Sequence, residues 1–381
     1  RIHRYTLNRL RAEIEPVSPA DFMRFLFRWQ HVESSSRLTG LDGLREVVAA
    51  LDGYELAAGA WERAVLPARL DQYDPSMLDM ICLAGEAGWA RLSPADGEAD
   101  PAPSLVPATP VALFLREHAG AWRMLRTTDG EPPLDEAARR VLAVLRSRGA
   151  SFFAELVPAC RLDADRVRHG LGALVACGLA TSDGFSGLRA LVWASRGRPA
   201  AHDRRSNFAG RWTAIARSDE GVTREEAIEL QGWALLRRYG VVFRRLLTRE
   251  TNAATWRELA RVYRRLEARG EIRSGRFVTG MSGEQFAIPD AVERLREVRR
   301  VPADGGLVTI SAADPLNLTG IVTAGERIRT AGRNRIVYRD GVPLAAAEGE
   351  FVRELAPMEP GIAADVSRAL RRRRMPALAL Q

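Results

Sequence analysis

Lysine is absent from the sequence, so all 56 basic side chains are arginines. Without lysine there is no P-loop lysine, no kinase lysine and no side-chain amine for a Schiff base. The composition therefore excludes lyase chemistry through lysine. It also excludes an ATPase motor within these 381 residues.

Cysteine is scarce as well. The three cysteines, Cys82, Cys160 and Cys177, lie far apart and form no C-x-x-C pair. This spacing argues against a disulfide framework and a structural zinc site, and no histidine has a partner at metal-ligand spacing. We expect small buried thiols in a reducing cytosol and no bound metal.

Long apolar runs are missing too. Stretches such as 111–115 are far shorter than the roughly 20 residues that a membrane span needs. No secretory signal is recognisable, so we expect a cytoplasmic protein without a membrane partner. The chain begins with Arg1 rather than Met, from which we expect a piece of a longer polypeptide.

The positive charge that is present is unevenly distributed. Residues 1–100 hold 11 arginines against 16 acids, whereas residues 237–300 hold 16 arginines against 8 acids. A basic stretch of this kind is typical of a surface that contacts phosphates. The alternative is an ordinary solvated helix face.

Changes in composition divide the chain into four units and a tail. Segments rich in Pro, Ala, Gly or charge indicate linkers at 94–110, 195–206 and 299–306. We expect a helix-rich winged-helix-like domain at 1–95, winged-helix domains at 108–195 and 207–300, a small β-barrel at 305–356 and a basic tail at 357–381. The predicted fold class is mixed α/β (α+β), with tandem winged helices followed by a small β-barrel.

Periodicity supports these assignments. In the second unit we expect helices at 136–148, 151–157 and 164–177, then strands at 179–182 and 188–193. In the third unit we expect helices at 234–246 and 255–269, then strands at 276–278 and 285–288. Period-two runs at 308–310, 320–322, 335–338 and 342–346 predict the barrel, since closure hides strand edges.

Long motifs carry a resemblance to a known family: RIHRYTLNRLRAEIEPVSPADFMRFLFRWQHV, GLREVVAALDGYELAAGAWERAVLPARL, LRRYGVVFRRLL, WRELARVYRRLEARGEIRSGRFVTGMSGEQFAIPDAV and ISAADPLNLTGI. They resemble the C-terminal region of the bacterial large helicase-related (Lhr) proteins. In that family a superfamily 2 motor translocates on single-stranded DNA and unwinds duplexes. Its C-terminal extension of winged helices and a β-barrel is similar in architecture to the AlkZ (YcaQ-like) DNA glycosylases, which excise crosslinked or alkylated bases.

The resemblance implies a role in DNA repair. It implies single-stranded or duplex DNA as a partner, together with the helicase core of the same polypeptide. It also implies a bacterial, nucleoid-associated location. ATP and Mg²⁺ are expected only for the absent motor domains, so we expect no cofactor in this chain.

Arginine-bearing helix faces are the first candidate sites. The recognition helix and wing of the third unit carry Arg257, Arg261, Arg264, Arg265 and Arg276, and the second unit carries Arg166, Arg168 and His169 at corresponding positions. A winged helix can place such residues on DNA phosphates. Glu258 and Glu267 are placed to neutralise part of the third unit's face, and winged helices also serve as protein-contact modules.

The triplet Trp29-Gln30-His31 is the enzymatic candidate. AlkZ-type enzymes carry a Q-x-Q or Q-x-D motif that positions or activates water. The resemblance places Gln30 at its first position, but Val32 stands where the second polar residue would be. Histidine is a common general base near neutral pH, and Trp29 is suited to stack on an extruded base. The alternative is that the triplet belongs to a core and a helix cap.

Three functions remain open. The first is an accessory DNA-binding module of a DNA-repair helicase, without ATPase activity of its own. The second is a monofunctional AlkZ-like DNA glycosylase that uses Gln30 and His31. The third is an oligomerisation platform in which winged helices contact neighbouring subunits of a homo-oligomer. Asp314 and Asn317, in DPLNLTG, are expected to shape a turn rather than a site.

Overall fold

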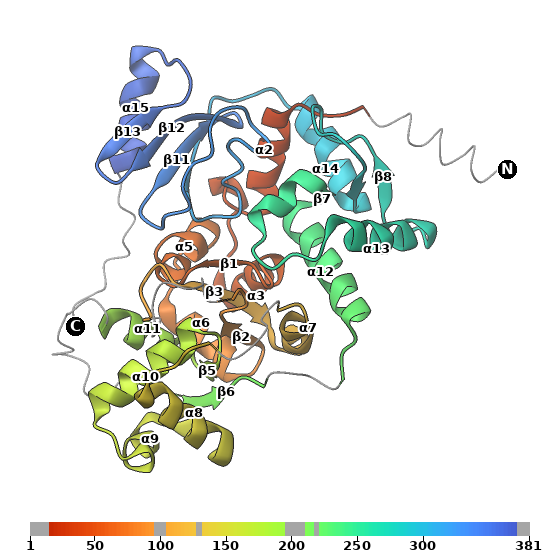
Figure 1. The fold of residues 1–381 in the computed structure, drawn as a ribbon. Helices are drawn as coiled ribbons and strands as arrows, with labels where there is room; N and C mark the ends of the chain where they lie inside the picture. Colours follow the sequence, from red (N-terminus) through yellow and green to blue (C-terminus); the bar gives the residue numbers. More distant parts are fainter. Residues whose placement is uncertain (1–14, 95–103, 127–131, 195–209, 217–220, 372–381) are drawn as a thin grey trace. The chain divides into compact units, whose positions relative to one another are not determined.

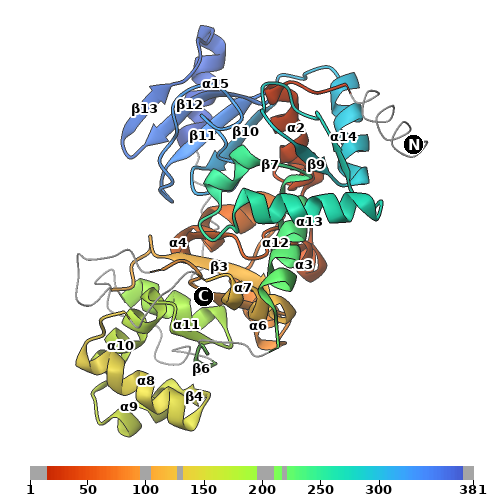
Figure 2. The ribbon, with the colours of Figure 1, turned by 45° about the vertical axis from the view of Figure 1, so that its right-hand side comes forward.

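The computed structural model describes residues 15–94, 104–126, 132–194, 210–216 and 221–371. The chain forms two compact units (Figures 1 and 2). Unit 1 comprises residues 1–38, 63–71 and 231–381, and unit 2 comprises residues 39–62 and 72–230. The expected linker at 195–206, much of the linker at 94–110 and the last ten residues of the basic tail lie outside the described residues.

One order of elements occurs three times: helix, strand, helix, helix, strand, strand. The first copy contains α3 (Gly40–Ala50), β1 (Glu55–Ala57), a helical stretch of α4 (Ala58–Ala60), η2 (Trp61–Val65) and α5 (Leu66–Arg69), then α6 (Pro75–Leu83), β2 (Ala87–Ala90) and β3 (Pro110–Leu115). The second contains α8 (Glu136–Arg148), β4 (Ser151–Phe152), α9 (Phe153–Cys160), α10 (Ala164–Ala176), β5 (Ala180–Ser182) and β6 (Arg211–Ala214). The third contains α12 (Arg224–Tyr239), β7 (Val241–Phe243), η4 (Arg244–Arg249), α13 (Trp256–Ala268), β8 (Arg273–Gly275) and β9 (Gln285–Ala287).

Each copy builds the same small sheet. The strands are antiparallel, and the last strand lies between the other two, in the orders β1-β3-β2, β4-β6-β5 and β7-β9-β8. A helix pair followed by a hairpin on a three-stranded sheet is the winged helix. The predicted class, mixed α/β with winged-helix domains, is confirmed.

The sequence explains why α13, the last helix before the wing of the third copy, forms where it does. Thr255 accepts from the backbone N–H of Glu258, and the Glu258 carboxylate accepts from the backbone N–H of Thr255, so the two residues make a capping box. Leu259, Val262, Tyr263 and Leu266 are buried at helical spacing along one face. The opposite face is left for charged residues.

Between β5 and β6 lies a helix where we expected a strand. The run 188–193 belongs to α11 (Phe185–Ala194), and the second wing strand is β6, further along the chain. The strand prediction was wrong because a short apolar run fits a buried helix as well as a strand. Its anchor is Arg189, whose Nε and Nη2 each lie 2.8 Å from a carboxylate oxygen of Glu62 and whose Nη1 lies 3.0 Å from Asp79 Oδ2.

The predicted small β-barrel at 305–356 is also wrong. The strands β10 (Leu307–Ser311), β11 (Arg335–Arg339), β12 (Val342–Glu348) and β13 (Phe351–Glu354) form an open antiparallel meander, and none of the sheets in the described residues closes. Helix α15 (Pro360–Arg371) packs against the sheet through Val366 and Leu370. The run 320–322, which we expected as a further strand, lies in a turn, so the sheet keeps four strands, with Phe351 and Val352 of β13 exposed.

Helix α2 (Pro19–Trp29) connects the elements of unit 1. Ser18 caps it by accepting from the backbone N–H of Asp21. It packs on α14 (Pro289–Arg300), and the ring centroids of Phe27 and of Tyr338 in β11 lie 5.1 Å apart. Figures 1 and 2 both show α2 beside α14. Gln30 follows as its C-cap residue, at the centre of the unit.

The remaining elements are short: η1 (Ser34–Ser36), η3 (Arg116–His118) and α7 (Ala119–Met124). In the part of the chain that the structure describes, no helix is both long and apolar enough to span a membrane.

Candidate nucleic-acid interface

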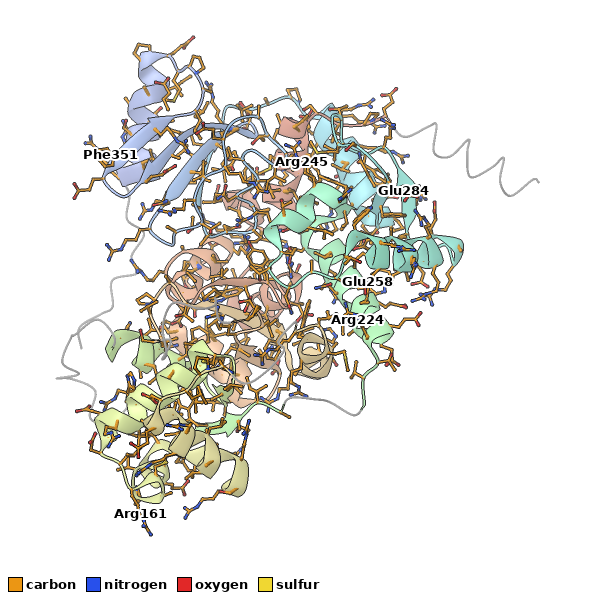
Figure 3. All side chains as sticks on the ribbon, in the orientation of Figure 1. Arg161, Arg224, Arg245, Glu258, Glu284 and Phe351 are labelled. Atoms are coloured by element: carbon orange, nitrogen blue, oxygen red, sulfur yellow. The ribbon has the colours of Figure 1, made fainter. Side chains whose placement is uncertain are left out.

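An open groove of about 970 Å³ lies beside α13 in unit 1. One wall is η4 with the residues that follow it, and the other is the first three turns of α13. In Figure 3, Arg245 marks η4, Glu258 marks α13 and Glu284 marks the wing. The lining consists of Arg244, Leu247, Thr248, Glu250, Thr251, Ala253, Ala254, Thr255, Trp256, Arg257, Ala260, Arg261 and Arg264. The groove thus combines guanidinium groups, threonine hydroxyls and an apolar floor.

Three of the groove's arginines are uncompensated. Arg244, Arg257 and Arg261 are exposed, and none of them forms an ion pair with another described residue. The fourth, Arg264, contacts Glu284 through Nε and Nη2, at 3.2 and 2.5 Å from the two carboxylate oxygens. This hydrogen bond to the Glu284 carboxylate raises the pKa of Arg264.

The groove's own acid is already neutralised. Arg238 Nη1 lies 2.5 Å from Glu250 Oε2, and the Tyr239 hydroxyl donates to Glu250 Oε1 at 2.9 Å. The Glu250 side chain is only 8% exposed. A phosphate in the groove would therefore meet three free arginines and no free carboxylate.

The other acids of α13 have structural tasks. Glu258 closes the capping box, and Glu267 Oε1 accepts from the backbone N–H of Ser274 in β8 at 3.2 Å and from its hydroxyl. Arg265 lies on α13 outside the groove and makes contacts of its own, whereas Arg276 is exposed just after β8. The structure thus brings Arg257, Arg261 and Arg264 together in the groove and leaves the other two beside it.

The corresponding helix of the second copy, α10, offers no such surface. Arg168 pairs with Asp165, Arg166 lies 3.7 Å from Glu136, and His169 Nε2 lies 2.9 Å from Asp135 Oδ2. The shallow hollow here is lined by Asp135, Glu136, Ala137, Asp165, Arg166 and His169, so acids outnumber arginines. Phosphate contacts by Arg166, Arg168 and His169 stay a prediction, and the neighbouring carboxylates would repel a phosphate here.

The corresponding helix of the first copy, α6, has no basic residue at all. Its exposed large side chains are Met80 and Leu83. Of the three copies, the third alone presents unpaired arginines among the described residues of this helix and its groove.

The triplet Trp29-Gln30-His31 is held in place by backbone contacts. Trp29 Nε1 donates to the carbonyl of Arg237 at 2.7 Å, and the Arg294 guanidinium lies 5.1 Å from the Trp29 ring centroid. Gln30 is 1% exposed and donates to the carbonyl of Arg238 at 2.7 Å. His31 has φ +60°, and its Nδ1 lies 2.7 Å from the carbonyl of Ser36. The geometry is that of a core and a cap.

Sequence reasoning missed Arg244, Arg69 and the role of Asp314. Arg244 is the first residue of the short 3₁₀ helix η4, and the sequence pattern had placed it near the end of a longer helix at 234–246 rather than in the wall of a groove. Arg69 and Asp314 meet across 245 positions. The sequence signal that could have pointed to Arg244 is the basic stretch at 244–265, taken as a whole rather than divided into helix faces.

Comparison with known proteins finds one family that two parts of the chain resemble. Two models described as "Large helicase-related protein, winged-helix domain" match residues 17–108 and 221–307. The chain thus contains two stretches that match winged-helix domains of the large helicase-related (Lhr) proteins. The second matched stretch contains the whole groove beside α13, so the candidate interface lies within an Lhr winged-helix domain.

Two curated Lhr proteins are similar over most of the chain. The "Lhr helicase/ probable uracil glycosylase" of Mycolicibacterium smegmatis is 29% identical over 347 residues, covering 84% of this chain and 22% of that protein. The "Lhr helicase/uracil glycosylase" of Escherichia coli is 28% identical over 367 residues, covering 84% and 23%. The chain spans less than a quarter of the length of these Lhr relatives.

Proposed function

We propose that this part of an Lhr protein is a DNA-binding accessory module, and that the groove beside α13 holds the DNA. The observation that carries the proposal is the set of three unpaired arginines, Arg244, Arg257 and Arg261, on facing walls of one groove. Phosphate contacts supply most of the affinity of such sites, and they need only positive charge at suitable positions.

The shape of the groove favours one strand over a duplex. A recognition helix that reads a major groove must protrude as a ridge, about 10–12 Å across with its side chains. Here the arginines of α13 and the helix η4 line the same groove. Its lining also contains Leu247, Ala254 and the partly exposed Trp256. A charged groove with apolar and aromatic surface suits a single strand, whose bases are free to contact it.

Salt-dependent binding tests the proposal. We would measure the affinity for a fluorescent single-stranded oligothymidine and for a duplex of equal length, over a range of salt concentrations. A strand that contacts three arginines gives a slope of log affinity against log salt of roughly −2, at about −0.7 for each phosphate. The substitutions Arg257→Gln and Arg261→Gln should each weaken binding and reduce the slope by about 0.7.

Arg166→Gln is the matched control. Arg166 is exposed on α10, the equivalent helix of the second copy, but it faces Glu136 and Asp165 in a hollow rich in acids. We expect this variant to bind like the unaltered chain. Equal losses for Arg166→Gln and Arg257→Gln would contradict a groove-specific site, and binding without salt dependence would contradict the proposal as a whole.

The names of both relatives favour base excision as a second candidate function. Uracil release is measured on single strands and duplexes that carry one deoxyuridine, beside Gln30→Met and His31→Ala variants. Gln30 has a buried amide with both ends bonded, so excision should survive Gln30→Met if the chain excises uracil at all. If the unaltered chain releases no uracil from either substrate, base excision by this chain is contradicted. Assembly into a homo-oligomer stays a prediction.

A further inference from the structure

Beneath the groove lies a closed ring of buried polar contacts within unit 1. We call it the Gln30 ring, and its members are Gln30, Arg69, Asp314, Arg249, Glu250 and Arg238. They come from five separate segments: the end of α2, the end of α5, the loop after β10, the end of η4 and the end of α12. Four of the six, Gln30, Arg69, Asp314 and Arg238, are 1% exposed.

The first half of the ring runs from Gln30 to the loop after β10. Arg69 Nη2 donates to Gln30 Oε1 at 2.6 Å. The same guanidinium clamps the Asp314 carboxylate, with Nη1 at 2.7 Å from Oδ2 and Nη2 at 2.9 Å from Oδ1. Arg69 Nη1 also donates to the carbonyl of Val65. Because Arg69 makes two hydrogen bonds to the Asp314 carboxylate and further bonds to Gln30 and Val65, the two buried charges are compensated.

The second half closes on the wall of the groove. Arg249 Nη2 donates to the carbonyl of Asp314 at 2.9 Å. The next residue, Glu250, bonds Arg238, and the carbonyl of Arg238 accepts from Gln30 Nε2 at 2.7 Å. Glu250 and its neighbour Thr251 line the groove. The wall formed by η4 is therefore attached to the interior at two adjacent residues, Arg249 and Glu250.

From this connection we infer that Gln30 is a positioning residue for DNA binding. Gln30 bonds the Arg238 backbone, Arg238 fixes Glu250, and Glu250 fixes the wall that carries Arg244. The width of the groove, and hence the distance between Arg244 and the arginines of α13, depends on this chain of bonds. Gln30 itself touches no DNA. The inference rests on the proposed function, since it assigns a role to Gln30 only if the groove binds DNA.

The ring also keeps the groove's charge positive. Arg238 holds Glu250 in a buried pair with the Tyr239 hydroxyl as a second donor. If Arg238 shifted, the Glu250 carboxylate would turn into the groove as an unpaired negative charge, facing the phosphates. Loss of the Gln30 contact thus acts on both width and charge, although Gln30 lies outside the lining.

A double-mutant cycle on single-stranded oligothymidine tests the inference. Gln30→Met keeps the length of the side chain and removes both hydrogen bonds. We expect it to weaken binding by about threefold to tenfold. Arg257→Gln measures the groove directly, and the double variant should lose less than the product of the two single losses, because both changes act on the same site.

Asn334→Leu is the control for a merely structural loss. Asn334 is a buried amide of unit 1 that, like Gln30, donates to one carbonyl, that of Arg329, and accepts one N–H, that of Gly349. Its loss should leave the affinity for the oligonucleotide unchanged. If Gln30→Met unfolds at the assay temperature, the same cycle is run with Gln30→Glu, which keeps the acceptor for Arg69.

The outcomes separate the two claims. A folded Gln30 variant that binds like the unaltered chain, or whose loss multiplies with that of Arg257→Gln, overturns the positioning role while leaving the groove as the DNA site. No effect of Arg257→Gln on binding overturns the groove itself. An equal loss in Asn334→Leu would assign the effect of Gln30 to general destabilisation and would also overturn the inference.

Discussion

The Asp314 carboxylate accepts hydrogen bonds from Nη1 and Nη2 of Arg69, at 2.7 and 2.9 Å, although 245 positions separate the two residues. Both side chains are 1% exposed. One residue ends α5 and the other lies in the loop after β10, so this ion pair joins two distant segments of unit 1.

Breaking the Arg69–Asp314 pair should be costly. Arg69→Met leaves a buried carboxylate without its partner, and such a change costs about 3–5 kcal/mol of unfolding free energy. The double variant Arg69→Met/Asp314→Leu should cost less than the sum of its parts, because no buried charge is left over. Arg28→Met, which breaks the partly exposed pair of Arg28 with Glu33, should cost no more than about 1 kcal/mol. Calorimetric unfolding ranks the three variants, and equal losses for Arg69→Met and Arg28→Met would contradict the prediction.

Arg189 should hold α11 in unit 2. It bonds Glu62 twice and Asp79 once, and the three side chains are 15–20% exposed. Arg189→Met leaves two carboxylates unpaired and should cost on the order of 2–3 kcal/mol. Hydrogen exchange should then accelerate in residues 185–194 more than in α10. Unchanged protection of α11 would show that its apolar contacts suffice.

Alkaline pH should destabilise the protein. Burial raises the pKa of the Cys82 thiol from its ordinary 9.0 to about 12 and that of Cys177 to about 11. Burial also raises the pKa of the Tyr263 and Tyr338 hydroxyls. The folded chain holds these protons to higher pH than the unfolded chain, so their contribution is complete below about pH 9 and is lost as pH rises toward the raised values.

Urea unfolding at a series of pH values checks this prediction. The free energy of unfolding should fall from about pH 9 upward, and Cys82→Ala should make that fall less steep. A profile that is flat through this range, or that is the same in Cys82→Ala, would contradict it. At neutral pH all three thiols are expected to be protonated and slow to react, since Cys82, Cys160 and Cys177 are buried.

Glu284 should compete with DNA for Arg264. The two side chains are about half exposed, so the pair is worth little by itself. Glu284→Gln frees the fourth arginine of the groove, and we expect roughly a twofold to fivefold gain in affinity for single-stranded DNA at low salt. Glu271→Gln is the matched control, since Glu271 pairs with Arg269 at the other end of α13, outside the groove. A gain in both variants would reflect net charge alone.

Local patterns predicted some helices closely, but the helix expected at 234–246 is wrong, since α12 ends at Tyr239 and the strand β7 and the start of η4 follow. The helix predicted at 136–148 has the bounds of α8, and the one predicted at 255–269 differs from α13 by one residue at each end. Asp135 and Thr255 cap these helices, and residues of these types before an apolar periodic run are recognisable helix starts. Asp-Gly is a typical hairpin dipeptide, and Asp340-Gly341 joins β11 to β12 with φ of +51° and +81° at these two residues. Each of these features depends on neighbours a few positions away.

Long-range features were not predictable in the same way. The apolar run at 188–193 suited a strand, and only its contacts with distant α6 and α4 make it a helix. The barrel prediction rested on exposed strand edges, but α15 packs on the sheet instead. For Gln30 the sequence left a catalytic role and a core or cap role open, and its amide bonds the Arg69 side chain and the Arg238 carbonyl. No sequence period encodes such partners.

The Gln30 ring sets a condition on how the groove can be assembled. Its members range from residue 30 to residue 314, so the last bond closes only after the most distant segments of unit 1 have met. Loops of that length close slowly and late. A piece cut at residues 221–307 would therefore contain a complete winged helix with every groove arginine, but its η4 wall would lack Gln30 and Asp314. In this protein, the boundary of the winged-helix domain and the boundary of the contacts that hold its groove wall do not coincide.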